Sequence, residues 1–370
     1  MHIPLVHLYI HVPFCARRCS YCDFAIAVRR TVPSDAFAQA VLAEWRGWQD
    51  HPAWDGSPVV DTIYFGGGTP SRLDSAAVAR LLDGIRSDRA VAADAEITLE
   101  ANPDDVSPAA ARAWRAAGVN RVSLGVQSFE PRVLGWMHRT HTAAQVPGAV
   151  AILRDAGIGN LSLDLIFALP RVLDRDWAAD LDRALALAPD HLSLYGLTVE
   201  PHTPLGRWTA RAEVRPLDDD AYASEFLTAV GRIAAAGFEH YEVSNAALPG
   251  RRARHNSAYW RRAPFIGLGP SAHSGFGATR QWNLRDWAAY QRAAAASQPL
   301  IAGREDLGPD ALRLEERYLG LRTSDGLPPA ALPDEIVARW HAAGWATTTD
   351  RVRLTPEGWL RLDALVAALP

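Results

Sequence analysis

Short apolar runs alternate with longer amphipathic stretches about six times along this chain, and this rhythm limits its fold more than any other feature. The runs that predict strands are Val6–Val12, Thr62–Phe65, Glu96–Glu100, Arg121–Val126, Leu161–Phe167 and His191–Leu197. The stretches that predict helices are Ser34–Trp48, Ser75–Arg86, Ser107–Ala117, Thr142–Ala156 and Asp176–Leu187. Repeated strand–helix units pack as a parallel sheet covered by helices. We therefore expect an α/β fold with a partial (β/α)6 barrel. A closed eight-fold barrel is the alternative, but the later chain loses the rhythm.

After Tyr290 the pattern changes to an alanine-rich helical stretch and then to a different order of elements. Helix, helix, hairpin and helix are expected in turn at Asp310–Leu321, Pro333–Ala343, Trp345–Leu354 and Pro356–Leu369. This order resembles a winged helix. From Arg304 onward, however, eight arginines stand against eleven acidic residues, a balance that opposes binding to nucleic acid phosphates. We expect two domains, residues 1–285 and residues 286–370, and no nucleic-acid partner.

The composition excludes several classes of function and points to a cytoplasmic location. The formal net charge is −4, and all 38 basic residues are arginine. The absence of lysine rules out a Walker-type phosphate site and Schiff-base catalysis by lysine. Met1–Pro4 lacks the basic and apolar regions of a signal peptide. No apolar run approaches the ~20 residues that a membrane span needs.

All three cysteines of the chain lie in one eight-residue stretch, as Cys15-x3-Cys19-x2-Cys22. Three thiols cannot all pair, and disulfides between neighbours this near would close strained rings. Three thiolates on one loop can instead bind three irons of a cubane iron–sulfur cluster, which leaves the fourth iron open to a small molecule. A zinc site that adds His11 to the cysteines is the alternative. It gives no role to the polar residues described next.

Polar residues and glycines follow the predicted strands at their carboxyl ends, where β/α folds place their active sites. Three consecutive glycines, with no Cβ, let the backbone approach a ligand closely. A carboxylate within a buried strand needs a partner. Glu100, Gln127, Asp164 and the nearby Arg139 would form a polar ring of donors and acceptors suited to a zwitterionic ribosyl ligand. Taken singly, each has a structural explanation: a tight turn, a buried carboxylate pair, a solvated arginine or a core tyrosine. The residues are Tyr9, Gly66, Gly67, Gly68, Thr69, Glu100, Gln127, Arg139 and Asp164.

The cysteine motif and the segments Gly-Gly-Gly-Thr-Pro, Glu-Ala-Asn-Pro and Gly-Val-Gln-Ser-Phe together resemble the radical S-adenosylmethionine (SAM) superfamily. The resemblance is closest to the branch related to oxygen-independent coproporphyrinogen III oxidase, and it covers nearly the whole chain. It implies a [4Fe–4S] cluster on Cys15, Cys19 and Cys22, with SAM bound at the open iron. The implied SAM contacts are Tyr9, Gly67, Gly68, Thr69, Glu100, Gln127, Arg139 and Asp164.

Within this branch the resemblance favours the HemW-type heme chaperones over the decarboxylating oxidases of porphyrin biosynthesis, which are the alternative. The oxidases carry a fourth cysteine where this chain has Phe24, and a longer segment before the cluster. The chaperones carry a His-Asn-x-x-Tyr-Trp motif implicated in heme binding, present here as His255–Trp260. The resemblance therefore implies heme contacts by His255, Tyr259 and Trp260. It also implies heme-accepting apoproteins as partners, acceptors at the membrane among them. His273 is a weaker candidate, and SAM binding is implied more firmly than SAM turnover. Without the resemblance, His255 would be read as a histidine satisfied at a structured turn.

Overall fold

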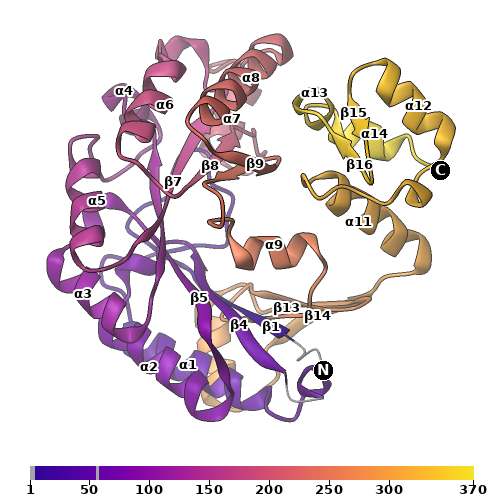
Figure 1. The fold of residues 1–370 in the computed structure, drawn as a ribbon. Coiled ribbons are helices and arrows are strands. Elements are labelled where there is room, and N and C mark those ends of the chain that lie inside the picture. Colours follow the sequence, from indigo (N-terminus) through magenta and orange to yellow (C-terminus); the bar gives the residue numbers. More distant parts are fainter. Residues whose placement is uncertain (1–4, 56–57) are drawn as a thin grey trace.

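A computed structural model describes residues 5–55 and 58–370, and within these ranges twelve strands form one open, twisted sheet (Figure 1). The centre of the sheet is parallel. Its strands in spatial order are β11 (Phe265–Leu268), β1 (Leu5–Val12), β4 (Val59–Gly67), β5 (Val91–Ala101), β6 (Arg121–Gln127), β7 (Asn160–Phe167) and β8 (His191–Gly196). Because all seven point the same way, their carboxyl ends meet at one edge.

Antiparallel strands extend the sheet on both sides and leave it open. Beside β11 lie β12 (His273–Phe276), β13 (Thr279–Asn283) and β14 (Ile301–Asp306); beside β8 lie β10 (Asn245–Ala247) and β9 (Glu239–Glu242). Among the described residues β14 and β9 are the two outermost strands, so the sheet does not close on itself. An open sheet of this kind leaves its concave side accessible at the carboxyl ends of the strands.

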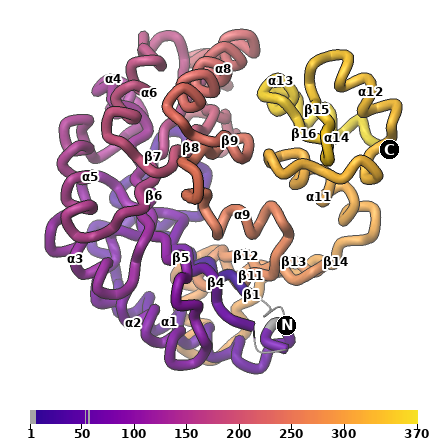
Figure 2. Tube along the Cα trace, in the orientation of Figure 1, coloured from indigo at the N-terminus to yellow at the C-terminus, as the bar shows by residue number. Residues whose placement is uncertain are grey.

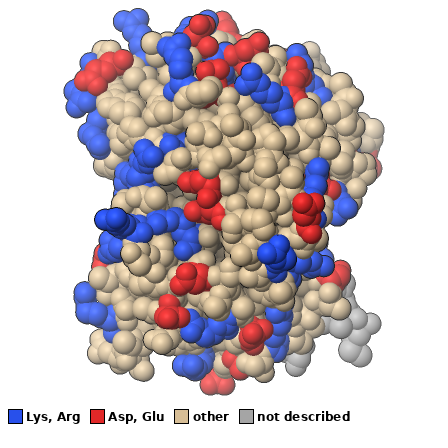
Figure 3. All heavy atoms as spheres, turned by 90° about the vertical axis from the view of Figure 1, so that its left-hand side faces the viewer, with Lys and Arg blue, Asp and Glu red and all other residues tan. Residues whose placement is uncertain are grey.

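Helices that follow the parallel strands cover the outer face of the sheet (Figures 1 and 2). They are α1 (Ser34–Gly47), α2 (Ser75–Asp88), α3 (Pro108–Ala117), α5 (Gln145–Asp155) and α6 (Trp177–Ala186). The short helix α4 (Pro131–Trp136) belongs to a separate apolar cluster beside the cysteine loop. The later helices are α7 (Pro204–Ala210), α8 (Asp219–Ala235), α9 (Arg254–Trp260) and α10 (Trp287–Ala295). On the outer face, arginine and acidic side chains are interspersed (Figure 3), which agrees with the small net charge.

The core lies between the sheet and these outer helices. Strand residues such as Ile10 and Phe65 are completely buried, and so are the helix residues Leu81 and Leu82 of α2. Trp45 of α1 is also buried, and its indole Nε1 donates to Asp88 Oδ2 at 3.0 Å. Burial of each such large apolar side chain stabilises the fold by ~1.5–3 kcal/mol, so the sheet is a rigid platform for its loops.

The six predicted strands and five predicted helices are all present, and the predicted α/β class with a large parallel sheet is confirmed. Sequence patterning missed β11 to β14, which are short and join the sheet beside β1 from more than 250 residues away. The domain boundary after residue 285 stays a prediction. Because β14 pairs with β13, we propose a boundary nearer to residue 307.

The C-terminal segment contains the expected helices and hairpin: α11 (Pro309–Leu321), α12 (Asp334–Ala342), β15 (Ala346–Thr348), β16 (Val352–Leu354), α13 (Pro356–Trp359) and α14 (Leu362–Ala367). Its resemblance to a winged helix stays a prediction. Backbone bonds from Val243 to Arg322 and from Ser324 to Tyr241 attach the segment to the edge strand β9. Met1–Pro4, from which the absence of a signal peptide is inferred, lies outside the described residues. Within those residues no helix is both long and apolar enough to span a membrane.

Candidate functional site

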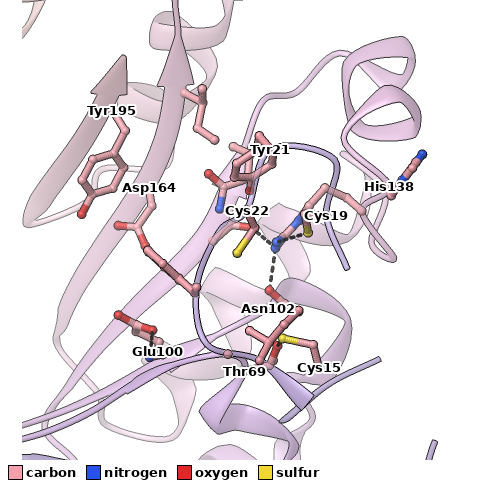
Figure 4. A pocket seen from close by; sticks show the side chains of 18 of the residues that line it. Cys15, Cys19, Tyr21, Cys22, Thr69, Glu100, Asn102, His138, Asp164 and Tyr195 are labelled. Carbon is pink, nitrogen blue, oxygen red and sulfur yellow. Dashed lines mark hydrogen bonds between the residues drawn. The ribbon is translucent and has the colours of Figure 1, made fainter. Parts of the chain in front are cut away.

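The cysteine loop is fixed at its base by a small parallel sheet. β2 (Phe14–Cys15) pairs with β3 (Ala27–Val28), and the amide of Ala27 donates to the Pro13 carbonyl at 2.7 Å. Further along the loop, Ser20 bonds through its backbone to Met137 and to Leu205. The loop is therefore held from three sides. All three cysteines are half-buried and line one cavity of about 420 Å³ at the carboxyl ends of the strands (Figure 4).

Hydrogen-bond donors approach two of the three sulfur atoms. The hydroxyl of Thr69 lies 3.4 Å from Cys15 Sγ, and Arg139 Nη1 lies 3.9 Å from Cys19 Sγ. Burial raises the pKa of the Cys22 thiol to about 11. Since thiolates are the form that binds metal, loading of this loop would release protons.

The glycine segment brings backbone close to the cysteine loop. The amide of Gly68 donates to the Val12 carbonyl at 2.7 Å, which ties the end of β4 to the end of β1. A Cβ on Gly68 would stand 2.8 Å from the Pro13 carbonyl carbon and oxygen, a distance that real Cβ atoms do not show. Gly67 has φ of 110°, a conformation that favours glycine. Both positions therefore require the absence of a side chain.

Two carboxylates lie on the other side of the cavity from Cys19 (Figure 4). Glu100 accepts from the Tyr64 hydroxyl at 2.8 Å and from the Gly67 amide at 3.1 Å, while Asp164 accepts from the Ser123 hydroxyl at 2.9 Å. Desolvation raises the pKa of both groups, that of Glu100 to about 7. Neither carboxylate forms an ion pair with any residue in the described ranges. The cavity thus offers two acidic groups to a cationic ligand.

Arg139 and Gln127 complete the predicted ring. Arg139 Nη2 donates to the Gly125 carbonyl at 2.8 Å and to Asn102 Oδ1 at 2.5 Å. Gln127 has φ of 66° and sits where the register between β6 and β7 shifts. A bulge of this kind turns a side chain away from the regular alternation of a strand. Ten predicted residues therefore meet in the cavity: Cys15, Cys19, Cys22, Gly67, Gly68, Thr69, Glu100, Gln127, Arg139 and Asp164.

Four of the predicted SAM and heme contacts do not line this cavity among the residues described: Tyr9, His255, Tyr259 and Trp260. Tyr9 packs against Tyr64 in a stacked arrangement, with ring centroids 6.1 Å apart, one layer below the cavity. His255 is buried on α9, where Nδ1 bonds to Thr62 and Nε2 to the Tyr259 hydroxyl at 2.8 Å. Trp260 lines a different and larger cleft. The predicted SAM role of Tyr9 and the predicted heme roles of the other three stay predictions.

Neither of the other histidine candidates lines the cysteine cavity. His11 Nε2 donates to the Ala25 carbonyl, 2.9 Å away, and the His11 ring lies against Gly67. His273 lies on β12, on the far side of β11. Across the described ranges, no three His, Cys, Asp or Glu side chains are close enough to share a single metal ion. A cubane cluster does not need three side chains around a single ion, because each thiolate binds its own iron.

Sequence reasoning missed several residues that line the cavity: Tyr21, Asn102, Ser123, His138, Tyr195, Thr198 and Glu200. Asn102 and Tyr195 stand at the ends of β5 and β8, so the strand-end rule could have found them. Tyr21 lies between two of the cysteines. His138, Thr198 and Glu200 come from loops whose position only the fold determines.

The residues present fit a [4Fe–4S] cluster and SAM. Three thiols on one loop with no fourth cysteine match a cubane that keeps one open iron. The sulfonium and ammonium groups of SAM are cations, and the unpaired carboxylates of Glu100 and Asp164 suit them. Gly67 and Gly68 line the same cavity with main chain rather than side chains.

Comparison with known proteins identifies this core. The profile of the radical SAM superfamily matches residues 9–184, which run from β1 through α6. Among solved structures, the Escherichia coli coproporphyrinogen III oxidase HemN superposes with a TM-score of 0.83 over 99% of this chain and 90% of that one, at 22% identity. At this identity the superposition establishes the fold. The fold and the cysteine cavity thus define a protein of the radical SAM class.

Curated sequences narrow the class further. The heme chaperone HemW of Mycobacterium tuberculosis is 39% identical over 369 residues, which cover 98% of this chain and 94% of that protein. The heme chaperone HemW of Escherichia coli is 40% identical over 272 residues, which cover 73% of this chain and 70% of that protein. The chain belongs to the HemW family of the radical SAM superfamily.

Replacement of Gly68 by alanine is expected to reduce the free energy of unfolding by ~1–3 kcal/mol, because the new methyl group meets main-chain atoms that cannot move aside. Gly231→Ala is the matched control: Gly231 lies within α8, and a Cβ added there would have no atom within 4 Å, so this variant is expected to gain ~0.5–1 kcal/mol. Denaturant titration of both variants measures the difference. Equal stability of the two variants would contradict the steric argument.

Proposed function

We propose that the protein is a heme chaperone: it holds a [4Fe–4S] cluster on Cys15, Cys19 and Cys22, binds SAM beside the cluster, and passes heme to acceptor apoproteins. The observation that carries the cluster and SAM assignments is the convergence of three thiols and two unpaired carboxylates on one cavity. The cluster would supply one electron, and SAM a sulfonium bond that an electron can break. The heme assignment is supported by the relatives, which are heme chaperones by name.

Phe24 supports a chaperone rather than a coproporphyrinogen oxidase. This residue stands where the oxidases have a fourth cysteine, and its side chain is 59% exposed at the mouth of the cysteine cavity. A phenylalanine side chain has no nitrogen, oxygen or sulfur atom and cannot take the place of a cysteine ligand. It adds apolar surface on which a macrocycle or an apolar partner could pack.

The experiment uses the full chain after anaerobic reconstitution with iron and sulfide. We expect about four irons per chain, saturable binding of hemin seen as a shift of the Soret band, and loss of hemin to an apoprotein acceptor such as apomyoglobin. Incubation with SAM, a reductant and coproporphyrinogen III is expected to give no vinyl product. Formation of protoporphyrinogen IX, or failure to bind hemin at micromolar concentrations, would reject the chaperone proposal.

The proposed heme role of His255 has a specific test, since both of its ring nitrogens are engaged in the present arrangement. Iron ligation by Nε2 would require the ring to leave the Tyr259 hydroxyl. We expect His255→Ala to lower the free energy of unfolding by ~2–4 kcal/mol, because two buried hydrogen bonds and a packed ring are lost. A changed Soret spectrum in the folded variant would support ligation. An unchanged spectrum and affinity would assign His255 to structure alone.

A further inference from the structure

A chain of hydrogen bonds leads from Asp164, which lines the cysteine cavity (Figure 4), into the interior of the protein. Ser162 Oγ donates to Asp164 Oδ1 at 3.1 Å and lies 2.8 Å from His191 Nδ1. His191 Nε2 lies 2.8 Å from the Tyr241 hydroxyl, which accepts from the Ala253 amide at 3.3 Å. Tyr241 lines a second cavity, and none of the described residues around it also lines the cysteine cavity. The chain therefore joins two separate cavities.

The pairing of the sheet places these side chains next to one another. Ser162 and Asp164 are two residues apart on β7 and share one face of the strand. His191 begins β8 and stands opposite Ser162. Tyr241 lies on β9, and the strand between β8 and β9 has Ala247 opposite His191. This small side chain leaves room for the imidazole to reach the tyrosine, so the contacts follow from the sheet and need no loop.

The protons in this chain can all point toward Asp164. A serine hydroxyl has one proton, and because Ser162 gives it to Asp164, Ser162 accepts from His191 Nδ1. The proton of the neutral imidazole is then on Nδ1, and Nε2 accepts from the Tyr241 hydroxyl. Burial and the positive charge of Arg121 lower the pKa of His191 well below its usual value, which keeps the ring neutral. An ionised Asp164 therefore selects the Nδ1–H tautomer of His191.

Protonation of Asp164 reverses every hydrogen bond in this chain. The proton of Ser162 moves to Asp164, the Nδ1 proton of His191 moves to Ser162, and the Tyr241 proton moves to His191 Nε2. The Tyr241 oxygen regains a proton from solvent at the second cavity, which this residue lines. One proton thus enters at Tyr241 and one arrives at Asp164, while Ser162, His191 and Tyr241 stay neutral. Hydrogen bonds in such a chain strengthen one another, so the groups change direction together.

Other polar and charged groups also act on this chain. Burial raises the pKa of Asp164, and the hydroxyls of Ser123, Ser193 and Ser162 and the charge of Arg121 oppose the rise. The ionisable groups that face Asp164 from the neighbouring strands are Tyr64 of β4, Glu100 of β5, Arg121 of β6 and Tyr195 of β8. Those around Tyr241 are Glu96, Arg121, His191, Glu242 and Arg252. Glu100 and Tyr195 line the cysteine cavity, so a ligand that fills this cavity closes their route to solvent.

We propose that Asp164, Ser162, His191 and Tyr241 form a proton relay through which the carboxylate facing SAM exchanges its proton with the second cavity. His191 is then a positioning residue, because its tautomer orients the Ser162 hydroxyl on Asp164. The inference rests on the proposed function and adds how a filled site adjusts its charge. An ionised carboxylate binds the cationic and hydroxyl groups of SAM more strongly than a neutral acid does. Bound SAM should therefore hold His191 in the Nδ1–H form.

The tautomer of His191 tests the direction of the relay. Nitrogen NMR of the full chain with isotope-labelled histidine distinguishes protonated from unprotonated ring nitrogens, and His191→Asn identifies the signal by its loss. At about pH 8 we expect a proton on Nδ1 and none on Nε2. As the pH falls and Asp164 is protonated, the proton should appear on Nε2, and SAM should shift this change to lower pH. A ring that keeps its proton on Nε2 at every pH, or is doubly protonated at about pH 8, would overturn the relay.

Tyr241→Phe removes one oxygen atom at the end of the relay and none from the cysteine cavity. Because His191 Nε2 then loses its donor, the ionised form of Asp164 is less stabilised. We expect SAM to bind roughly 2- to 10-fold more weakly and to be lost at a higher pH. Tyr290→Phe is the matched control, since it removes a buried hydroxyl that donates to Glu44 at 2.5 Å, outside the relay. This variant should lose stability and keep both the SAM affinity and the His191 tautomer.

The outcomes separate the relay from the proposed function. A wild-type chain that shows the Nδ1–H form of His191 and its reversal with pH, but binds no SAM, would reject the SAM site and keep the relay. A chain that binds SAM equally well with and without the Tyr241 hydroxyl, over the whole pH range, would reject the relay and keep the SAM site. Thermal unfolding of each variant is measured in parallel. A Tyr241→Phe chain that loses only stability would assign the hydrogen bonds to structure alone.

Discussion

Replacement of Cys19 by alanine is expected to give a folded chain that holds no [4Fe–4S] cluster. Iron is expected to fall from about four per chain to near zero, because two cysteines cannot retain a cubane in place of three. The fold should survive, since the Cys19 thiol accepts its hydrogen bond from Arg139 at 3.9 Å, which is too long and weak to contribute much. Iron and acid-labile sulfide analysis after anaerobic reconstitution measures the first effect, and circular dichroism the second.

Arg18→Ala is the matched control for this prediction. Arg18 lies in the same loop, does not line the cavity, and makes one long bond of 3.5 Å to the Cys22 carbonyl. We expect this variant to keep the full cluster. A Cys19→Ala chain that also retains about four irons would show that Cys19 is not a ligand.

SAM affinity is expected to fall when the carboxylate of Glu100 loses its charge. We expect Glu100→Gln to bind SAM roughly 10- to 100-fold more weakly, because a charged hydrogen-bond partner becomes neutral. The wild-type chain should show the same loss with pH. Its Glu100 has a pKa raised to about 7 by desolvation, so the carboxylate is charged above pH 7 and protonated below it. The affinity should therefore drop as pH falls below 7, by up to about tenfold per unit.

Glu44→Gln provides an unusually close control. Glu44 is another buried glutamate whose pKa is raised to about 7 by desolvation, but it bonds to Gly269, Asn283 and Tyr290, away from the cysteine cavity. This variant should lose stability and keep the pH profile of SAM binding. Isothermal titration between about pH 6 and about pH 8.5 distinguishes the two glutamates. A Glu100→Gln profile that still bends near neutral pH would assign the titration to another group.

Much of the candidate site follows from strand order along the sequence. Parallel strands bring their carboxyl ends to one edge, so the sequence alone predicts that Cys15, Gly67, Glu100, Gln127 and Asp164 lie together, as they do. Four of these residues follow or end a strand whose apolar pattern is clear, and Asp164 lies within β7, three residues before its end. The prediction requires only that the six strands be parallel and adjacent, which they are.

The apolar pattern of the sequence does not show how far Tyr9 lies from the cavity, because that distance depends on the register between strands. In the β1–β4 pair Tyr9 stands opposite Tyr64, while Val12 stands opposite Gly67 at the level of the cavity. Tyr9 is therefore three positions below the strand end, and only the pairing register reveals this. The position of α9 could not be predicted from the sequence either. Its partner strand β4 lies about 190 residues earlier, and the hydrogen bond between Thr62 and His255 corresponds to no repeating pattern in the sequence.

The aromatic residues beneath the cysteine cavity have a consequence for the two proposed ligands. Glu100, at the cavity, accepts from Tyr64; the Tyr64 ring stacks on His255 with centroids 5.0 Å apart; and His255 bonds to Tyr259 on the helix that ends in Trp260. This layer of rings therefore lies between the proposed SAM site and the proposed heme contacts on α9. If a ligand bound at one site shifts these rings and so changes the affinity of the other site, thermodynamic linkage requires the coupling free energy to be the same in both directions. Occupancy by SAM would then set how tightly heme is held, and heme would set the affinity for SAM by an equal factor.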